Sequence, residues 1–343
     1  KDYKVITNSG EGMWLQNTRE RPMDQPFFFW FAALDAHRDW GENEFSGTHN
    51  PENIYPPFYL ANGEKTKQDL AQYYDEIYRF DHHIGLVVNE LNNQGVLDNT
   101  VIMVMADNGR PFPHSKTRVN DRGMKTPFII HWPEVVKQGE TNALISTIDI
   151  APTILELAGL KVSNFFQGIS FSTILGNPQL KTRQFVFAEH NWHDYEAFER
   201  MVRDEEFMYI RNYRPDKPQM GPADVIGSPS FEELWLRKEK GVLTQVQTDI
   251  FITPRPHEEL FYYPNDSLQL LNIASVPTYK DNLIRLCEIM DTWMSETKDN
   301  VPLNLTPDWF EKVPGYIKTD QHGQRGEMPG SKEATKVNAK GPY

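Results

Sequence analysis

Two neighbouring side chains with oxygen ligands directly follow an apolar run of the sequence. Residues 100–106 are apolar or β-branched, which predicts a buried strand, and Asp107, Asn108 and Gly109 come next. In open α/β sheets, ligands bind just beyond the carboxyl ends of the strands. A carboxylate beside an amide oxygen suits a hard cation such as Ca²⁺ at that place. Asp-Asn-Gly is also a common turn sequence, so these three residues alone leave both interpretations open.

The loop that follows is rich in positive charge. Before a second apolar run at 127–132, it contributes Lys116, Arg118, Arg122 and Lys125. A metal ion held by oxygen ligands and backed by basic side chains can bind an anionic group of a substrate. We therefore expect an anion-binding site at the end of the first strand.

A histidine follows another apolar run. Residues 26–34 (PFFFWFAAL) predict a buried strand, and Asp35, Ala36, His37 and Arg38 come directly after it. A histidine in such a place is more often hydrogen-bonded for structural reasons than catalytic. Its position alone therefore does not decide its role.

One short segment combines aromatic, basic and acidic side chains. Residues 189–194 (EHNWHD) contain His190, Trp192, His193 and Asp194. A flat aromatic face with hydrogen-bonding neighbours suits a sugar ring. A polar loop that carries one packed tryptophan would have the same composition, so both interpretations stay open.

The elements that would position these groups change in type along the chain. Residues 65–92 carry apolar side chains at helical spacing and end near Gly95, which predicts a long amphipathic helix. A helix placed before the strand 100–106 indicates an α/β unit of the doubly wound kind. Residues 146–159 predict a second helix, with Asp149 as a cap and Gly159 at its C-terminal end.

From residue 184 onward the apolar runs are short and closely spaced, which is typical of an antiparallel sheet. A helix is predicted at 281–297. We predict three regions: 1–180 as part of an α/β domain, 181–311 as a smaller α+β subdomain, and 312–343 as an extended tail.

The composition excludes several classes of protein. A net charge of −13 over 343 residues argues against general nucleic-acid binding, which needs a broad basic face. No apolar stretch approaches the roughly 20 residues of a membrane span. The single cysteine excludes an internal disulfide framework and a cysteine-based zinc site.

Several segments together resemble the sulfatase family. The family's second metal-binding segment has the form strand–Asp-Asn-Gly, then a lysine, then Gly-x-(Arg/Lys)-x-Pro, and residues 100–127 have this form. The segment that ends in His37 and the helix 146–159 are similar to further family segments, although Ala36 replaces the usual proline. The variant DNGRPFP at 107–113, together with the histidine–tryptophan motif at 190–193, resembles the heparan N-sulfatase branch.

The resemblance implies an α/β fold of the alkaline-phosphatase type, with a mixed or parallel sheet flanked by helices and a smaller C-terminal antiparallel sheet subdomain. It implies one Ca²⁺ ion held partly by Asp107 and Asn108, with His37 and Lys116 as catalytic residues. Residues implied to bind the substrate are Arg38, His190, His193 and Asp194.

The implied activity is hydrolysis of a sulfate ester or sulfamate on a sulfated sugar. The expected substrate is a glycan of the glucosamine type. The resemblance implies a periplasmic, secreted or lysosomal location. The expected partner is the sulfated carbohydrate, without nucleic acid or a membrane span, and the oligomeric state is left open.

The family's nucleophile is not in this sequence. It is a formylglycine made from Cys or Ser in a (Cys/Ser)-x-(Pro/Ala)-x-Arg motif, whereas Cys287 is followed by Glu-Ile-Met-Asp. We therefore expect that the chain lacks the N-terminal part of a sulfatase, which would carry the nucleophile and the remaining metal ligands, and that the chain alone is inactive. Two alternatives stay open: a phosphate or phosphonate ester hydrolase of the same superfamily, and a non-catalytic carbohydrate-binding relative. Asn108 favours the sulfatase, because those hydrolases typically have a histidine there.

Overall fold

The computed structural model describes residues 10–329 and residue 336. The chain forms two compact units, each made of discontinuous segments. The first unit consists of Lys1–Val104, Phe128–Glu134 and Ser228–Gln247, and the second of Met105–Pro127, Val135–Gly227 and Thr248–Tyr343.

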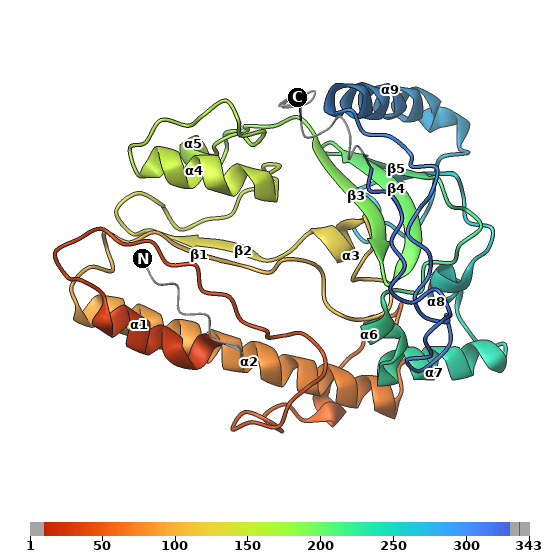
Figure 1. Ribbon diagram of the computed structural model, residues 1–343, viewed down its shortest axis with the longest axis horizontal. Helices are drawn as coiled ribbons and strands as arrows, with labels where there is room; N and C mark the ends of the chain where they lie inside the picture. Colours follow the sequence, from red (N-terminus) through yellow and green to blue (C-terminus); the bar gives the residue numbers. More distant parts are fainter. Residues whose placement is uncertain (1–9, 330–335, 337–343) are drawn as a thin grey trace. The chain divides into compact units, whose positions relative to one another are not determined.

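The first unit is organised around one long helix, α2 (Glu64–Asn93), which confirms the helix predicted at 65–92. Figure 1 shows the short helix α1 (Trp14–Glu20) beside it. The carboxylate of Glu233, in helix α7 (Pro229–Glu239), accepts hydrogen bonds from the Thr66 amide (3.0 Å) and hydroxyl (2.7 Å). This contact closes the first turn of α2, whose amides have no partner within the helix. The helix ends before Gly95, which adopts a left-handed conformation (φ 68°) as glycine does readily.

Two short strands, β1 (Ile102–Met105) and β2 (Phe128–His131), pair with each other. They occupy the predicted positions, but the prediction of full burial was wrong. The β1 side chains are half-buried, and Ile129 of β2 is 59% exposed. A strand is fully buried only when both faces of its sheet are covered, and the sheet of β1 and β2 is covered only in part.

Residues 26–34 form no strand, so that prediction was also wrong. Alternate side chains of this segment point to opposite sides: Phe29 stacks on Phe31, which stacks on Trp14 of α1 (5.2 Å), whereas Phe28 and Trp30 are 64% and 76% exposed. The apolar pattern was read correctly as extended chain. A strand also needs a hydrogen-bonded neighbour, and none is paired with this segment among the described residues.

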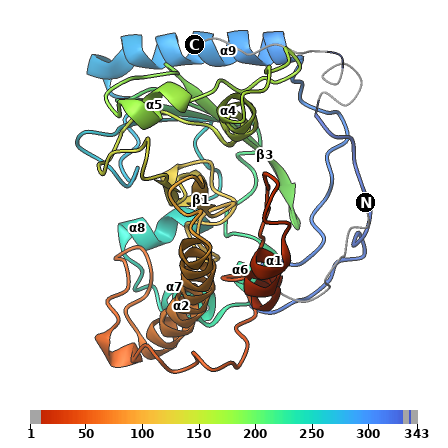
Figure 2. The same ribbon diagram turned by 90° about the vertical axis from the view of Figure 1, so that its left-hand side faces the viewer.

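The second unit contains the predicted antiparallel sheet. Its strands β3 (Val186–His193), β4 (Tyr195–Arg203), β5 (Phe207–Asn212) and β6 (Glu258–Tyr262) pair in that order, each antiparallel to the next. Helix α9 (Lys280–Thr297), predicted at 281–297, covers one face of this sheet (Figure 2). Leu286 and Met290 of α9 pack there against Tyr209 and Leu260.

The opposite face of the sheet holds the loop that follows β1. Val119 packs there against Met201, Met208, Ile210 and Phe261. This contact explains why the second unit includes residues 105–127, and why the division into units differs from the boundary predicted at residue 180.

The predicted helix 146–159 is present as a 3-10 turn, Thr147–Asp149, followed by α4 (Ile150–Leu157). Ser146 and Asp149 form a capping box, and the buried Asp149 carboxylate also pairs with Arg183 (2.5 Å). The remaining short helices are η1 (Gly10–Met13), η2 (Pro51–Asn53), α3 (Asp121–Met124), α5 (Ser172–Gly176), α6 (Ala223–Ile226), α8 (Gln245–Thr248), η4 (Asp249–Phe251) and η5 (Pro277–Tyr279).

The region predicted as a tail from 312 is described as far as residue 329; residues 330–335 and 337–343 lie outside the described part. Glu311 donates a hydrogen bond from its amide to Ile317 (2.7 Å), and its carbonyl accepts one from the Tyr195 hydroxyl (3.2 Å). The start of this region is therefore packed on the β3–β4 hairpin.

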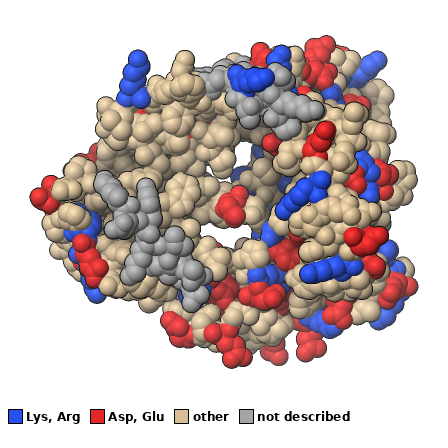
Figure 3. Space-filling model, in the orientation of Figure 1, with Lys and Arg blue, Asp and Glu red and all other residues tan. Residues whose placement is uncertain are grey.

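The surface carries charges of both signs. Figure 3 shows acidic and basic side chains interspersed on one face, without a broad basic area. Across residues 10–329 and 336, no helix combines the length and apolar character needed to cross a membrane.

Candidate active site

The Asp107-Asn108-Gly109 turn packs closely against the loop that carries Lys116. The Gly109 amide donates a hydrogen bond to the Gly123 carbonyl (2.8 Å). A Cβ on Gly109 would lie 2.0 Å from the Arg122 carbonyl oxygen, and a Cβ on Gly123 would lie 2.0 Å from that of Arg118. Both glycines are therefore required by close backbone approach, which gives the spacing of this motif a physical reason.

The loop around Lys116 is buried and strained. His114 and Thr117 both have positive φ (68° and 70°), a conformation that is unfavourable for side chains with a Cβ and most of all for a β-branched one. The Lys116 amide donates to the Arg110 carbonyl (3.2 Å), and the whole Lys116 residue is only 6% exposed. Strain of this kind persists where surrounding contacts over-determine the backbone, and it clusters at functional sites.

An acidic residue from a distant segment supplies those contacts. Asp249 of η4 pairs with the guanidinium of Arg118 (3.0 Å) and lies 3.6 Å from the His114 ring. Although burial opposes it, the Arg118 cation lowers the pKa of the Asp249 carboxyl. Burial lowers the pKa of the His114 imidazole to about 4, so this ring is neutral at pH 7.

Lys116 faces the start of helix α6. Its ammonium lies 2.7 Å from a carboxylate oxygen of Asp224, and the neighbouring amide of Ala223 donates to the carboxylate of Asp194 (3.0 Å). The His193 ring lies 3.2 Å from the same Asp194 carboxylate. Against the effect of burial, the hydrogen bond from His193 and that from Ala223 lower the pKa of Asp194. The structure thus brings three predicted site residues, Lys116, His193 and Asp194, to one side of α6.

His190 lies in a different, buried polar network on the sheet. Its ring is 3.4 Å from the carboxylate of Glu199, its direct neighbour across β3 and β4. Glu199 also pairs with Arg255 (2.6 Å) and accepts a short hydrogen bond from Gln219. Against the desolvation of this buried carboxyl, Arg255 and then His190 lower the pKa of Glu199 to about 2. His190 is thus held by Glu199, apart from the α6 group in its direct contacts.

Trp192 is packed rather than open on both faces. Its indole N–H donates to the Pro307 carbonyl (3.0 Å), and its ring meets Trp309 edge to face with ring centres 4.5 Å apart. The guanidinium of Arg325 lies over it at 4.9 Å. Trp192 is therefore packed, and it lies in strand β3 rather than in the polar loop of the alternative interpretation, whereas sugar binding by this segment stays a prediction.

His37 and Arg38 belong to the first unit, whereas the other predicted site residues belong to the second. Arg38 is buried, and its guanidinium donates to both carboxylate oxygens of Asp69 in α2 (2.6 and 2.7 Å). The His37 ring is exposed and contacts the Arg38 carbonyl. Arg38 thus fixes the end of segment 26–34 to α2, and its contact with substrate stays a prediction.

Asp107 and Asn108 fit part of a metal site. Asp107 is exposed, and the Asn108 side-chain N–H donates to the Gly109 carbonyl (2.7 Å), which leaves its side-chain oxygen as the acceptor. Within the described residues, no three His, Cys, Asp or Glu side chains are grouped to hold a metal. Because Ca²⁺ takes about six to eight oxygen ligands, this pair can supply only some of them.

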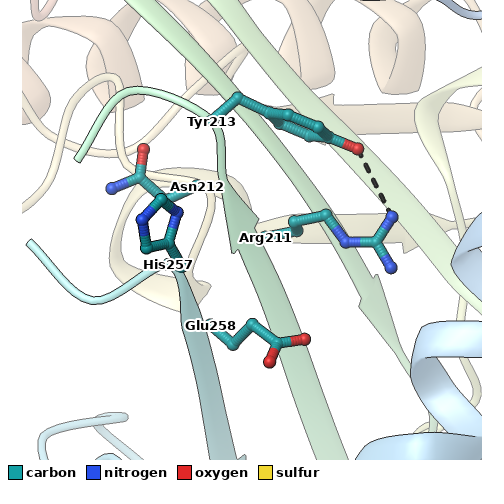
Figure 4. Close-up of a pocket in the computed structure, with 5 residues that line it drawn as sticks. All are labelled: Arg211, Asn212, Tyr213, His257 and Glu258. Atoms are coloured by element: carbon teal, nitrogen blue, oxygen red, sulfur yellow. Dashed lines mark hydrogen bonds between the residues drawn. The ribbon is translucent and has the colours of Figure 1, made fainter.

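A separate shallow pocket of about 320 Å³ lies at the end of β5 and β6, lined by Arg211, Asn212, Tyr213, His257 and Glu258 (Figure 4). The Arg211 guanidinium is already held by Asp291 (2.5 Å), by the Tyr209 hydroxyl (3.1 Å) and by the Tyr213 hydroxyl (3.4 Å, dashed in Figure 4). This pocket contains none of the predicted site residues.

Sequence reasoning missed Asp224, Asp249, Glu199 and Arg255. The sequence held a signal for Glu199 alone, because it lies with Arg200 in the middle of an otherwise largely apolar strand. Asp224 is 108 residues from Lys116, and no local pattern predicts that pairing.

Comparison with known proteins gives two family matches. The sulfatase family model matches residues 13–160, and the model of the C-terminal region of N-sulphoglucosamine sulphohydrolase matches residues 114–219. An ulvan-active sulfatase from Formosa agariphila is 32% identical over 88% of this chain and 57% of its own length. The human N-sulphoglucosamine sulphohydrolase is 27% identical over 83% of this chain and 63% of its own length.

Solved structures show the same fold. A Bacteroides thetaiotaomicron chain, described in terms of the metabolism of multiple glycosaminoglycans, has a TM-score of 0.58 at 16% identity and covers 84% of this chain and 60% of its own length. The phosphonate monoester hydrolase of Agrobacterium radiobacter has a TM-score of 0.56 at 18% identity and covers 81% of this chain and 58% of its own length.

The chain thus spans about three fifths of the length of the curated relatives that it matches. The Asp-Asn-Gly turn and the Lys116 loop lie inside the region matched by the sulfatase model, and strands β3, β4 and β5 lie inside the region matched by the C-terminal model. The chain belongs to the sulfatase family, and its residues 114–219 are similar to the C-terminal region of N-sulphoglucosamine sulphohydrolase.

Proposed function

We propose that the protein containing this chain hydrolyses a sulfate ester or sulfamate on a sulfated sugar of the glucosamine type. The observation that carries the proposal is the buried, strained Lys116 loop, whose Gly123 is hydrogen-bonded to Gly109 of the Asp-Asn-Gly turn. A lysine that is desolvated and fixed in this way serves an anion better than a mobile surface lysine, because its charge is already oriented. The human relative is named for N-sulphoglucosamine, which supports the substrate class.

Each candidate site residue of this chain has a defined role in the proposed reaction. Lys116 neutralises the charge that develops on the sulfate oxygens, and Asp224 orients its ammonium. His37 gives a proton to the departing oxygen or nitrogen of the sugar. Asp107 and Asn108 would supply some of the ligands of a Ca²⁺ ion, which would polarise the sulfate oxygens.

The substrate's sugar is bound, in this proposal, by Arg38, His190, His193 and Asp194. The nucleophile in this proposal is a formylglycine, by resemblance to the family, and residues 1–343 contain no motif for it. A periplasmic, lysosomal or secreted location is part of the same proposal.

Hydrolysis of a phosphate or phosphonate ester is the second candidate. The fold alone does not exclude it, because the phosphonate monoester hydrolase has the same fold. Asn108 argues against phosphate or phosphonate hydrolysis. Those hydrolases bind two metal ions, and the neutral amide of Asn108 is a weaker ligand for the second ion than the histidine that they typically have there. A carbohydrate-binding role without catalysis is the third candidate, and it predicts that no ester is hydrolysed.

The test measures release of sulfate or phosphate by the complete protein from glucosamine N-sulfate, glucosamine 6-sulfate, 4-nitrophenyl sulfate and a phosphonate monoester. We expect sulfate release, with kcat lowered about 100-fold or more by Lys116→Ala, as for loss of one charge-stabilising donor. Lys181→Ala is the matched control, because that lysine is 60% exposed and pairs with Glu205. Preferred hydrolysis of the phosphonate would overturn the proposal, and so would equal activity of Lys116→Ala and the control.

A further inference from the structure

The segment that follows α9 returns to the β3–β4 hairpin and is firmly bound there. The Trp309 amide donates to the Asp194 carbonyl (2.8 Å), and the Glu196 amide donates to the Asp308 carboxylate (2.7 Å). The Trp192 indole N–H donates to the Pro307 carbonyl (3.0 Å). Residues 307–309 are therefore fixed at the end of the hairpin that carries His193 and Asp194.

This segment places a stacked arginine on the hairpin. The guanidinium of Arg325 lies over the ring of Trp309 (4.1 Å) and over that of Trp192 (4.9 Å). The Trp309 ring is held by a hydrogen bond from its N–H to the Gln324 carbonyl (2.7 Å), and the His322 ring lies beside it at 5.2 Å. Arg325 is exposed, so the five N–H donors of its planar guanidinium are accessible to a ligand.

Arg325 differs from the neighbouring basic residues in having no acidic partner. Lys312 pairs with Asp308 (3.0 Å) and Arg214 with Asp216 (2.7 Å). No carboxylate in residues 10–329 pairs with Arg325, in a chain of net charge −13. A planar, stacked and uncompensated guanidinium is suited to bidentate binding of a sulfate or carboxylate.

Direct contacts connect this arginine to the Lys116 group. Lys116 contacts Asp224, the adjacent Ala223 amide contacts Asp194, and the Asp194 carbonyl contacts Trp309, on which Arg325 stacks. These contacts join Arg325 and Lys116 through one continuous set of neighbouring residues in the second unit.

We propose that Arg325, supported by Trp192 and Trp309, binds the anionic group of the sugar unit next to the one that reacts. The anionic group is a sulfate or a uronate carboxylate. The inference rests on the proposed function for the position of the reacting sugar, and it assigns to residues 307–325 the recognition of a chain rather than of a single sugar.

The test is a calorimetric titration of the complete protein, with its nucleophile replaced by alanine so that no ligand is consumed. The ligands are glucosamine N-sulfate and a sulfated glucosamine–uronate tetrasaccharide. We expect Arg325→Gln to weaken tetrasaccharide binding about tenfold, as for loss of a hydrogen bond to a charged group, and to leave the monosaccharide affinity unchanged. Arg325→Lys should recover only part of the loss, because it keeps the charge without the planar fork.

Arg285→Gln is the matched control, since Arg285 is a half-exposed arginine on α9 that pairs with Asp204 (2.5 Å). Tetrasaccharides that lack either the sulfate or the carboxylate of the second unit identify which group Arg325 binds. Equal loss of affinity for both ligands, or no loss for the tetrasaccharide, would overturn the inference. If Lys116→Ala changes the binding of neither ligand, the proposed function fails separately, whatever Arg325 does.

Discussion

Asp107 is the residue on which the metal assignment depends. Its side chain is exposed, so Asp107→Ala should change the stability of the metal-free protein by less than about 0.5 kcal/mol. In the complete protein, Ca²⁺ at 100 times its dissociation constant should stabilise the wild type by about 2.7 kcal/mol and the variant by much less.

Thermal unfolding with Ca²⁺ and with a chelator measures this difference. Asp98→Ala, at another exposed aspartate near β1, is the control and should keep the full metal-dependent shift. An equal shift in Asp107→Ala would remove this residue from the metal site.

His114 predicts a dependence of stability on pH. Burial lowers its pKa from 6.5 to about 4, so between these values the unfolded chain binds more protons than the folded one. The contribution of His114 to stability is therefore complete above pH 6.5 and is lost as pH falls towards 4. The charged groups that face it are Asp249, Arg118 and Arg122.

Urea unfolding at several pH values between 4 and 7 should show a shallower slope of unfolding free energy against pH in His114→Gln than in the wild type. His257→Gln, at an exposed histidine, should keep the wild-type slope. A variant slope equal to that of the wild type would show that His114 does not titrate in this way.

The turn and loop that form the site act as one element, because two glycines bring their backbones together. Gly123→Ala would place a Cβ 2.0 Å from the Arg118 carbonyl, so we expect a loss of stability of several kcal/mol or a displaced loop. Activity of the complete protein should fall with it, since Lys116 lies in the same loop. Gly139→Ala meets no atom within 4 Å and should leave both the midpoint of unfolding and the activity unchanged.

The elements that the sequence predicts well are those with local signals. Helices α2, α4 and α9 have apolar residues at helical spacing and a glycine or capping residue at an end, and no distant contact is needed to read them. The turn at Asp107 and the position of Lys116 follow from motif spacing. Contacts such as Asp249 with Arg118 join residues far apart in the sequence, so no periodicity reports them.

The segment 26–34 shows where a local pattern fails to predict structure. Its apolar run predicts a strand because a run of this length is usually buried in a sheet. Whether it pairs depends on neighbours that the local sequence does not specify, and in the structure only one of its two faces is covered within the first unit.

For the whole chain, we expect no hydrolysis of 4-nitrophenyl sulfate by purified residues 1–343. The sequence contains no formylglycine motif, and Asp107 with Asn108 provides only some of the ligands of a metal ion. The measurement compares the chain with the complete protein at equal concentration. Turnover by the chain that exceeds the background, and that Lys116→Ala removes, would contradict the expectation and require another nucleophile within residues 1–343.

The cap of α2 also has a consequence for the order in which the chain folds during synthesis. Glu233 closes the first turn of this helix from 167 residues away, and Ser230 contacts Asp69 in the same helix from 161 residues away. A ribosome makes about 5–20 residues per second, so α2 emerges roughly ten or more seconds before the residues that complete its contacts. The continuous stretch 135–227 is made in that interval. The second unit can therefore begin to fold before α7, which belongs to the first unit, has been synthesised.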